Sequence, residues 1–424
     1  MLSDVNAKSV VGLCFAVCAV VTLSQLYEVD VNKPSLNILP KPKNDREGGV
    51  VHWIDSPAIL EELDKYKPPS SAEVKKIMKR SREFDVEWPA KFNKNFRSQC
   101  WNKKGKLHCL PNAYLLGIAK CATSSIWKSL FAHPQVQGHA RIKRSGNILE
   151  PQKESHWWSN RRFYGEKISN TYSAEFGKAL FLWVERKDWK KTLLIDGSPD
   201  TLWNQGLIYN FRKISNAHVK KELPAPNIVA ASFIKEYTPG SKFIISLRNP
   251  VDRLYSHQCM LERRRRHPLP ESLLKSDFHR KVVVAVGILK DCFKRRTIRE
   301  CAYDSGIIAR LDDQVRDESV GIMTIQAGLY VVFISDWLKV IPRDKFYITT
   351  KEVYVTNPSK VIGEIFNFLE LDEVAISSDG QTTTVNVNAY GPMLSQTAEL
   401  LDEFYRPFNE ALAKLLEDQK YLWL

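Results

Sequence analysis

The sequence lacks several of the short motifs that would identify its chemistry directly. It has no Walker A motif (G-x-x-x-x-G-K-[ST]) and no acidic Mg²⁺-binding motif beside its lysine-bearing loop, which disfavours a kinase. No spacing of histidine and cysteine is typical of a zinc site. The one match to an N-glycosylation sequon, Asn357-Pro358-Ser359, is disqualified by its proline. The chemistry therefore has to be inferred from the residues around the predicted strands and helices.

The composition is that of a globular protein with an excess of positive charge. Of 424 residues, 44% are apolar and 26% are charged, which excludes a mostly disordered or collagen-like chain. Lys and Arg number 62 against 48 Asp and Glu, so the formal net charge is +14. Such an excess indicates an anionic partner, which is a nucleic acid, a membrane surface or an acidic substrate.

The N-terminal segment predicts entry into the secretory pathway. Residues 10–27 are mostly apolar, and we interpret them as a short, uncleaved signal anchor behind a cytosolic tail of residues 1–9. A cleaved signal peptide is the alternative, although no A-x-A site follows the run. Either way the rest of the chain is expected in the lumen, which argues against nucleic acid as the partner. Residues 28–100 are charged and proline-bearing and are predicted to form a stem, which leaves 101–424 as the main folded domain.

Cysteine spacing agrees with an oxidising compartment. Cys100 and Cys109 are nine residues apart, as are Cys292 and Cys301, and each pair flanks a basic, turn-like segment. Each pair could therefore close a small disulfide loop, although the sequence alone leaves the connectivity open. The cysteines left over are Cys121 and Cys259.

Short apolar runs alternate with helical patterns in the folded part. Because buried strands that alternate with helices form parallel sheets, we expect an α/β fold with a parallel sheet flanked by helices. Ligands of such sheets bind at the carboxyl ends of the strands. Strands are predicted at 114–118, 192–195, 242–247 and 346–349, and helices from about 123, at 326–340 and at 358–368.

A lysine and three hydroxyl residues follow the first of these strands. This loop leads directly into a helix N-terminus, where unpaired backbone N–H groups and the helix dipole favour an anion. The lysine adds a full positive charge to such a site. The alternative is a capped helix that follows a core strand and carries a solvated lysine. The loop residues are Lys120, Cys121, Ala122, Thr123, Ser124 and Ser125.

A second candidate anion site follows the third strand. Arg248 stands at the strand end, and Ser256 lies about two turns into the next helix. An arginine fork and a hydroxyl suit a phosphate, whereas a simple Arg–Asp pair with Asp252 is the alternative. Two anion sites at the ends of two parallel strands suit a nucleotide with phosphates at both ends of its ribose.

These motifs resemble those of the Golgi carbohydrate sulfotransferases, which use 3′-phosphoadenosine 5′-phosphosulfate (PAPS), and in particular those that act on N-acetylgalactosamine 4-sulfate. The resemblance runs from about Cys109 to the C-terminus and implies the PAPS-dependent sulfotransferase fold, which is related to the P-loop kinases. The matching segments are L-P-N at 110–112, K-E-S-H-W-W at 153–158, G-S-P-D-T-L-W at 197–203, 248–256, G-L-Y-V-V at 328–332, D-W-L at 336–338 and F-Y-R-P-F-N at 404–409.

The resemblance implies a role for each site residue. Glu154 matches the general base, and Lys120 and His156 complete the expected catalytic set. The pair Cys292 and Cys301 matches a disulfide loop of relatives. No metal ion is expected, because a transferred sulfo group carries less charge than a phosphoryl group. The expected donor-binding residues are 120–125, Arg248 and Ser256, and the expected acceptor-binding residues are Lys153, His156, Ser198 and Arg144.

Purely structural roles are the alternatives for Glu154 and His156. The loop before the first helix also departs from the family pattern. Glu154 could be an exposed partner of Lys153, and His156 a structural histidine beside two tryptophans. Relatives usually have Pro and Gly where this chain has Ala119 and Ala122. Alanine at the glycine position would restrict the loop unless its φ is negative. In addition, residues 381–390 lack the basic residues expected there.

The acceptor is expected to be an anionic polysaccharide. Basic residues precede Glu154 (Arg141, Lys143 and Arg144), and the four arginines 263–266 follow the second motif. A solvated face or a processing site are alternatives for 263–266. The predicted reaction is transfer of a sulfo group from PAPS to O6 of N-acetylgalactosamine 4-sulfate in chondroitin or dermatan sulfate. Other regiospecificity, such as heparan sulfate 3-O, and a non-catalytic polysaccharide binder are the alternatives. The expected location is the Golgi membrane as a single-pass type II protein, and a homodimer is left open.

Overall fold

The computed structural model of the chain describes residues 54–84, 92–142, 149–181, 188–203, 225–304, 307, 324–373 and 390–424. All of them belong to one unit that begins at His52. The predicted signal anchor lies outside the described residues. Within the described part, no helix combines the length and the apolar character that crossing a bilayer requires.

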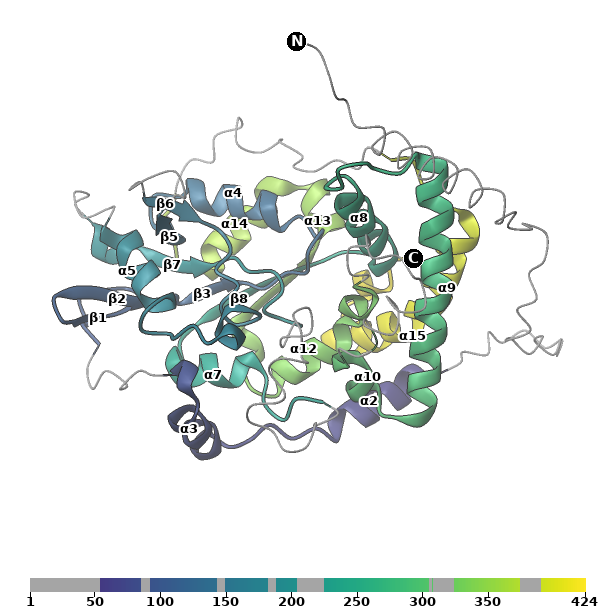
Figure 1. Cartoon of the computed structure of the whole chain (residues 1–424). Helices are drawn as coiled ribbons and strands as arrows, with labels where there is room; N and C mark the ends of the chain where they lie inside the picture. Colours follow the sequence, from purple (N-terminus) through teal and green to yellow (C-terminus); the bar gives the residue numbers. More distant parts are fainter. Residues whose placement is uncertain are drawn as a thin grey trace, which may run out of the picture. The chain divides into compact units, whose positions relative to one another are not determined.

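A five-stranded parallel sheet forms the centre of this unit (Figure 1), as the alternating pattern predicts. Its strand order is β4-β7-β3-β8-β9, and every neighbouring pair is parallel. The predicted strands are present, with ends that differ by up to three residues, and β4 is an additional edge strand. The bounds are β3 Ala113–Leu115, β4 Val136–Gln137, β7 Leu193–Asp196, β8 Lys242–Leu247 and β9 Phe346–Thr350.

Alternate residues of each strand point to opposite faces of the sheet, and each face packs against its own helices. In β8, Phe243 and Ile245 join a large core with α7 (Ala230–Tyr237), α12 (Tyr330–Leu338) and α15 (Ser395–Leu416). Ile244 joins a smaller core on the other face, built with α4 (Thr123–Ala132), α13 (Lys351–Thr356) and α14 (Pro358–Phe368). Figure 1 shows these helix groups on either side of the sheet. Because both faces are covered, most residues of the strands are apolar.

The large core extends well beyond the sheet. Helices α8 (Pro250–Glu262) and α9 (Glu271–Arg295) pack beside α15, and α10 (Ile298–Tyr303) packs against α9 and α12. The helix predicted at 326–340 is interrupted, because a 3₁₀ turn at Ile325–Gly328 precedes α12. The remaining elements are β1 Gln99–Lys103, β2 Lys106–Leu110, β5 His139–Ile142, β6 Leu149–Gln152, α5 Tyr172–Phe181 and the 3₁₀ turns Arg82–Phe84, Arg161–Tyr164, Trp189–Lys191, Arg343–Lys345 and Gln419–Leu422.

Both cysteine pairs form disulfides. Cys100–Cys109 joins the two strands of the β1–β2 hairpin, and Cys292–Cys301 joins the end of α9 to α10. Of the described cysteines, Cys121 and Cys259 form no disulfide and are buried. Two nine-residue loops closed in this way suit an oxidising compartment.

Part of the predicted stem packs against the domain. Two helices lie in it, α2 (Ser56–Asp64) and α3 (Ser71–Arg80), and the second begins with a capping box between Ser70 and Glu73. Their apolar residues, Ile59, Leu63, Val74 and Met78, are buried in the large core. Residues 56–84 therefore contribute to the same packed unit as the sheet.

Candidate active site

The loops that carry the predicted site residues meet at the carboxyl edge of the sheet. Strand pairing continues past the end of β3, where the Leu116 N–H donates to the Ile244 carbonyl and the Ile118 N–H to the Ser246 carbonyl. Gly117 lies in this close approach, because a Cβ there would come within 2.9 Å of the Ser246 carbonyl oxygen. The loop before α4 is thus held directly against the end of β8, next to Arg248.

The loop after β3 takes an unusual backbone conformation. Lys120 has a φ of 77° and Ala122 a φ of 61°, so both occupy the left-handed region. The carbonyl of Cys121 between them accepts a hydrogen bond of 2.6 Å from the Ser246 hydroxyl. Ala122 is the N-cap of α4 and makes no side-chain cap. Ala122 would fit this loop without strain only with a negative φ. Because its φ is positive, alanine here occupies a conformation that favours glycine.

Lys120 lies in a strongly positive environment. Its side chain makes no hydrogen bond or ion pair with the described residues. Burial and the nearby charges of Arg263, Arg248 and Arg264 lower the pKa of Lys120 to about 8. A group of cations that lowers the pKa of one member is stabilised by a bound anion, because the anion offsets their repulsion.

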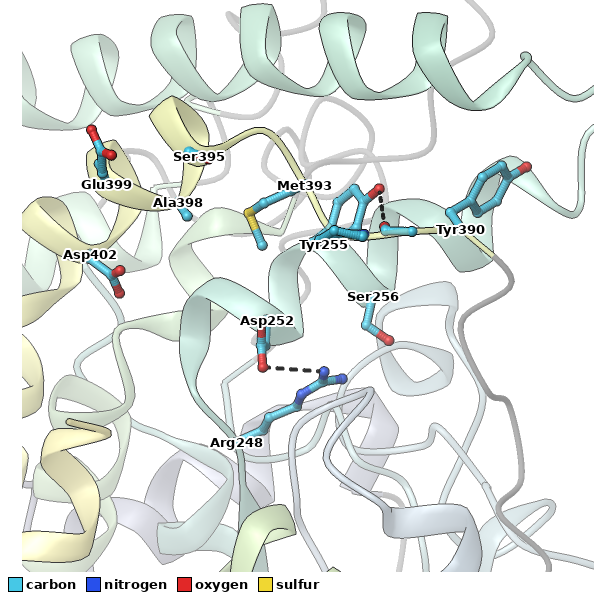
Figure 2. Close-up of a pocket in the computed structure, with 12 residues that line it drawn as sticks. Arg248, Asp252, Tyr255, Ser256, Tyr390, Met393, Ser395, Ala398, Glu399 and Asp402 are labelled. Atoms are coloured by element: carbon cyan, nitrogen blue, oxygen red, sulfur yellow. Dashed lines mark hydrogen bonds and ion pairs between the residues drawn. The ribbon is translucent and has the colours of Figure 1, made fainter.

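Arg248 and Ser256 line the same cavity, of about 620 Å³, between α8 and the segment that leads into α15 (Figure 2). The Tyr255 hydroxyl donates to the Gly391 carbonyl at 3.1 Å and closes one wall. The alternative Arg–Asp pair also forms, with the Arg248 guanidinium 3.5 Å from the Asp252 carboxylate. Because the Asp252 side chain is 55% exposed, this pair is weak and leaves Arg248 available to an anion.

Glu154 is paired with two cations. Its carboxylate lies 2.8 Å from the Lys153 Nζ and 3.0 Å from the His156 Nε2. Burial favours a raised pKa, but the His156 hydrogen bond and the Lys153 charge outweigh it and lower the pKa of Glu154 to about 2. The Lys153 Nζ also donates to the Thr123 Oγ1 at 3.2 Å. Lys153 thus links the carboxylate of Glu154 to Thr123, at the end of the loop after β3.

His156 lies between two carboxylates. Its Nε2 faces Glu154, and its Nδ1 lies 3.0 Å from a carboxylate oxygen of Asp200, a residue that sequence reasoning missed. Burial opposes protonation, yet the hydrogen bonds to Asp200 and Glu154 prevail and raise the pKa of His156 to about 10. His156 is therefore an imidazolium at neutral pH, which positions Glu154 and does not compete with it as a base.

A buried carboxylate holds the backbone of this segment. Asp196, at the end of β7, is 1% exposed and accepts four hydrogen bonds, from the Ser155 and Tyr172 hydroxyls and from the N–H and hydroxyl of Ser198. The Ser198 hydroxyl in turn accepts from the His156 N–H at 2.9 Å. These bonds hold His156 at a φ of 51°. Ser198 is itself 1% exposed, so we expect it to position this segment and not to contact an acceptor.

The basic residues predicted to grip the acceptor fall into different groups. Arg141 is engaged within the protein, with Glu175 at 3.2 Å and the Ser155 carbonyl at 3.0 Å, which assigns it a structural role. Lys143 and Arg144 lie outside the described residues, as do 381–389. In the segment 263–266, Arg265 pairs with the buried Glu262 at 3.0 Å, whereas the other three arginines are exposed.

The structure brings Lys120, Arg248 and Glu154 of the predicted site to the same edge of the sheet. The Lys153 ammonium group donates hydrogen bonds to both Thr123 and Glu154. Arg248 lies close enough to Lys120 for its charge to lower the pKa of Lys120. Ser124 and Ser125 are half-buried in the first turn of α4, whereas the thiol of Cys121 is buried. The two predicted anion sites and the carboxylate of Glu154 therefore share one edge of the sheet.

Comparison with known proteins agrees with the predicted resemblance. No protein-family model matches the chain. Carbohydrate sulfotransferase 15 of Mus musculus and of Homo sapiens are each 26% identical, over 77% and 76% of this chain and 57% and 56% of their own length. The membrane-associated sulfotransferase kil1 of Dictyostelium discoideum is 21% identical over 78% of this chain and 70% of its own. The chain thus spans somewhat more than half the length of the mouse and human relatives, and the resemblance to carbohydrate sulfotransferases is confirmed.

Among solved structures, a sulfotransferase from Alicyclobacillus acidocaldarius aligns with a TM-score of 0.44 at 19% identity, over 73% of this chain and 96% of its own. The sulfotransferase domain from the curacin biosynthetic pathway aligns with a TM-score of 0.28 at 12% identity, over 73% and 98%.

The backbone of the loop gives a first prediction. Because Ala122 has a positive φ, Ala122→Gly should relieve strain and raise the free energy of unfolding by up to about 1 kcal/mol. Ala119 is the matched control, since its φ is not positive, and Ala119→Gly should lower the free energy of unfolding. Urea denaturation of both variants checks this. Equal destabilisation by the two substitutions would contradict it.

A second prediction concerns the proton on His156. Asp200→Asn removes a carboxylate from its Nδ1, so the pKa of His156 should fall from about 10 toward 6.5, by roughly one to three pH units. A raised pKa contributes stability that is complete below pH 6.5 and is lost as the pH rises through about 10. The destabilisation of the variant relative to the unaltered chain should therefore be largest at pH 6.5 and below and should diminish as the pH rises toward 10. NMR titration of labelled histidine measures the pKa directly. Asp188→Asn, at an exposed site, is the control, and an unchanged His156 titration in Asp200→Asn would refute the prediction.

Proposed function

We propose that this relative of the carbohydrate sulfotransferases transfers a sulfo group from PAPS to a hydroxyl of a glycosaminoglycan. The observation that carries the proposal is that one ammonium group contacts both parts of the site. The Lys153 Nζ lies 3.2 Å from the Thr123 hydroxyl oxygen and 2.8 Å from the Glu154 carboxylate, so it joins the predicted anion site to the predicted base. A site of this kind can hold an anionic donor and remove a proton beside it. The similarity to proteins named carbohydrate sulfotransferase 15 supports a carbohydrate acceptor.

The residues at the sheet edge fit a nucleotide with two anionic ends. Lys120, Thr123 and Ser124 would hold the 5′-phosphosulfate, and Arg248 and Ser256 the 3′-phosphate. The fit rests on the absence of a carboxylate partner for Lys120 among the described residues and on the weakness of the Arg248 pair. When bound, the donor supplies a sulfo group whose sulfur–oxygen bond to the 5′-phosphate is the one that breaks.

Glu154 is placed to take the proton of the acceptor hydroxyl. As the hydroxyl oxygen bonds to sulfur, its proton passes to the Glu154 carboxylate, and the electron pair of the broken bond leaves with the phosphate. Lys120 is placed to offset the charge that grows on that phosphate. His156, held as a cation by Asp200, keeps the Glu154 carboxylate oriented. Each side chain of the set thus has a separate task.

The acceptor we propose is chondroitin or dermatan sulfate, modified at O6 of N-acetylgalactosamine 4-sulfate. Support comes from the +14 charge of the chain and from the exposed arginines of 263–266, two of which lie near Lys120. We also propose that the chain is a Golgi membrane protein with a lumenal domain, which the two disulfides and the apolar segment 10–27 support.

The decisive assay uses labelled PAPS and the full-length chain with unsulfated, 4-sulfated and 6-sulfated chondroitin, dermatan sulfate and heparan sulfate. We expect label on 4-sulfated acceptors, and Glu154→Gln should lower the rate about 10²–10⁴-fold with the affinity for PAPS retained. Disaccharide analysis of the product identifies the position.

Glu61→Gln is the control, because Glu61 is an exposed residue outside the site. Label on another acceptor would assign another regiospecificity. Nucleotide binding without transfer to any acceptor would leave a polysaccharide binder and overturn the proposed reaction, and full activity of Glu154→Gln would overturn the assigned base.

A further prediction concerns the arginines near Lys120. Replacing Arg263 and Arg264 with Gln should raise the KM for 4-sulfated chondroitin about tenfold, because each removes a charge that faces a sulfated chain. The KM for PAPS should rise less, although both arginines also lie near Lys120 of the proposed donor site. Arg266→Gln is the control, since Arg266 is exposed in the same segment and is not among the charges that lower the Lys120 pKa. A rise in the KM for PAPS alone would contradict an acceptor role.

A further inference from the structure

A lysine that no motif singled out lies beside Arg248. Strands β8 and β9 pair in parallel up to Leu247 and Thr350, which are partners in the register. Arg248 directly follows β8, and Lys351, the first residue of α13, directly follows β9, so the two residues stand next to each other at the carboxyl edge of the sheet. A hydrogen bond of 3.2 Å from the Asn249 N–H to the Glu352 carboxylate ties the two strand ends together.

Lys351 is charged, half-buried and without a partner among the described residues. It makes no hydrogen bond or ion pair with them. The neighbouring carboxylate of Glu352 is occupied by the Asn249 N–H and by the Trp423 indole, which donates to it at 3.3 Å. Burial and the charge of Arg248 lower the pKa of Lys351. Two cations therefore lie together at this edge. The carboxylates of Glu352 and Asp252 offset their charge only in part, because burial and the charge of Arg248 still lower the pKa of Lys351.

We propose that Lys351 is a further donor-binding residue, which binds the 3′-phosphate of the nucleotide together with Arg248 and Ser256. The inference rests on the proposed function, because it takes the nucleotide as the ligand of this edge. A dianionic phosphate would offset the repulsion between the two cations. The guanidinium supplies a planar fork and the ammonium a point charge, so the two side chains can approach different phosphate oxygens. Lys120 follows β3, on the other side of β8 from Lys351, and would bind the 5′-phosphosulfate.

The test compares two nucleotides that differ only in the 3′-phosphate. Adenosine 3′,5′-bisphosphate and adenosine 5′-monophosphate are titrated calorimetrically into the full-length chain and into Lys351→Met. We expect the variant to bind the bisphosphate about tenfold more weakly or worse and the monophosphate as before. Lys351→Arg should keep most of the affinity. Lys360→Met is the matched control, since Lys360 is an exposed lysine on α14 outside the site.

The outcomes separate this inference from the proposed function. If the unaltered chain does not prefer the bisphosphate, the assignment of a PAPS site fails. If it does, and Lys351→Met keeps the full preference, the role of Lys351 is refuted while the donor site stands. An equal loss for both nucleotides would also refute the assignment to the 3′-phosphate. In the double variant with Arg248→Met, losses that are less than additive are expected if both side chains bind one phosphate.

Discussion

The geometry of the candidate site depends on one buried carboxylate, that of Asp196. It accepts hydrogen bonds from Ser155, Ser198 and Tyr172. The Ser198 hydroxyl in turn accepts a hydrogen bond from the His156 N–H and so fixes the His156 backbone. The left-handed φ of His156 would not persist without such bonds, because a histidine in that region is strained. Asp196 thus holds the turn between Glu154 and His156, so that both side chains reach the same face of the sheet edge.

The positive charges at this edge have a consequence for stability as well as for binding. Lys120 is flanked by Arg263, Arg264 and Arg248, and Lys351 adds a further cation on the other side of Arg248. Like charges that are partly withdrawn from water destabilise the folded chain until a counter-charge binds. A ligand that binds only the folded state stabilises it in proportion to its affinity. Binding of a polyanionic nucleotide should therefore stabilise this edge of the sheet in particular.

The sheet, and the meeting of the loops after β3 and β8 at its carboxyl edge, could be predicted from the sequence, because a buried parallel strand is a largely apolar run that can be located in the sequence. Asp200 and Lys351 could not be predicted, because neither residue type is unusual at its position and their roles depend on register and on contacts across the sheet edge. The positive φ of Ala122 could not be predicted either. The sequence shows that alanine replaces the usual glycine, but it does not give the backbone angle. Ser198 was assigned to the acceptor from the resemblance, whereas its hydroxyl is buried in the Asp196 network.

The protonation states of Glu154 and His156 indicate how donor binding and proton transfer are coupled. His156, with a pKa of about 10, keeps its proton, so of these two side chains only Glu154 is free to accept one at neutral pH. With a pKa of about 2, however, Glu154 is a weak base as long as both cations bind it. Lys153 donates to Thr123 as well as to Glu154, so an anion that binds at Thr123 competes with Glu154 for the ammonium group. Loss of Lys153 would raise the pKa of Glu154 and strengthen it as a base. The carboxylate would then gain basicity only when the donor is in place.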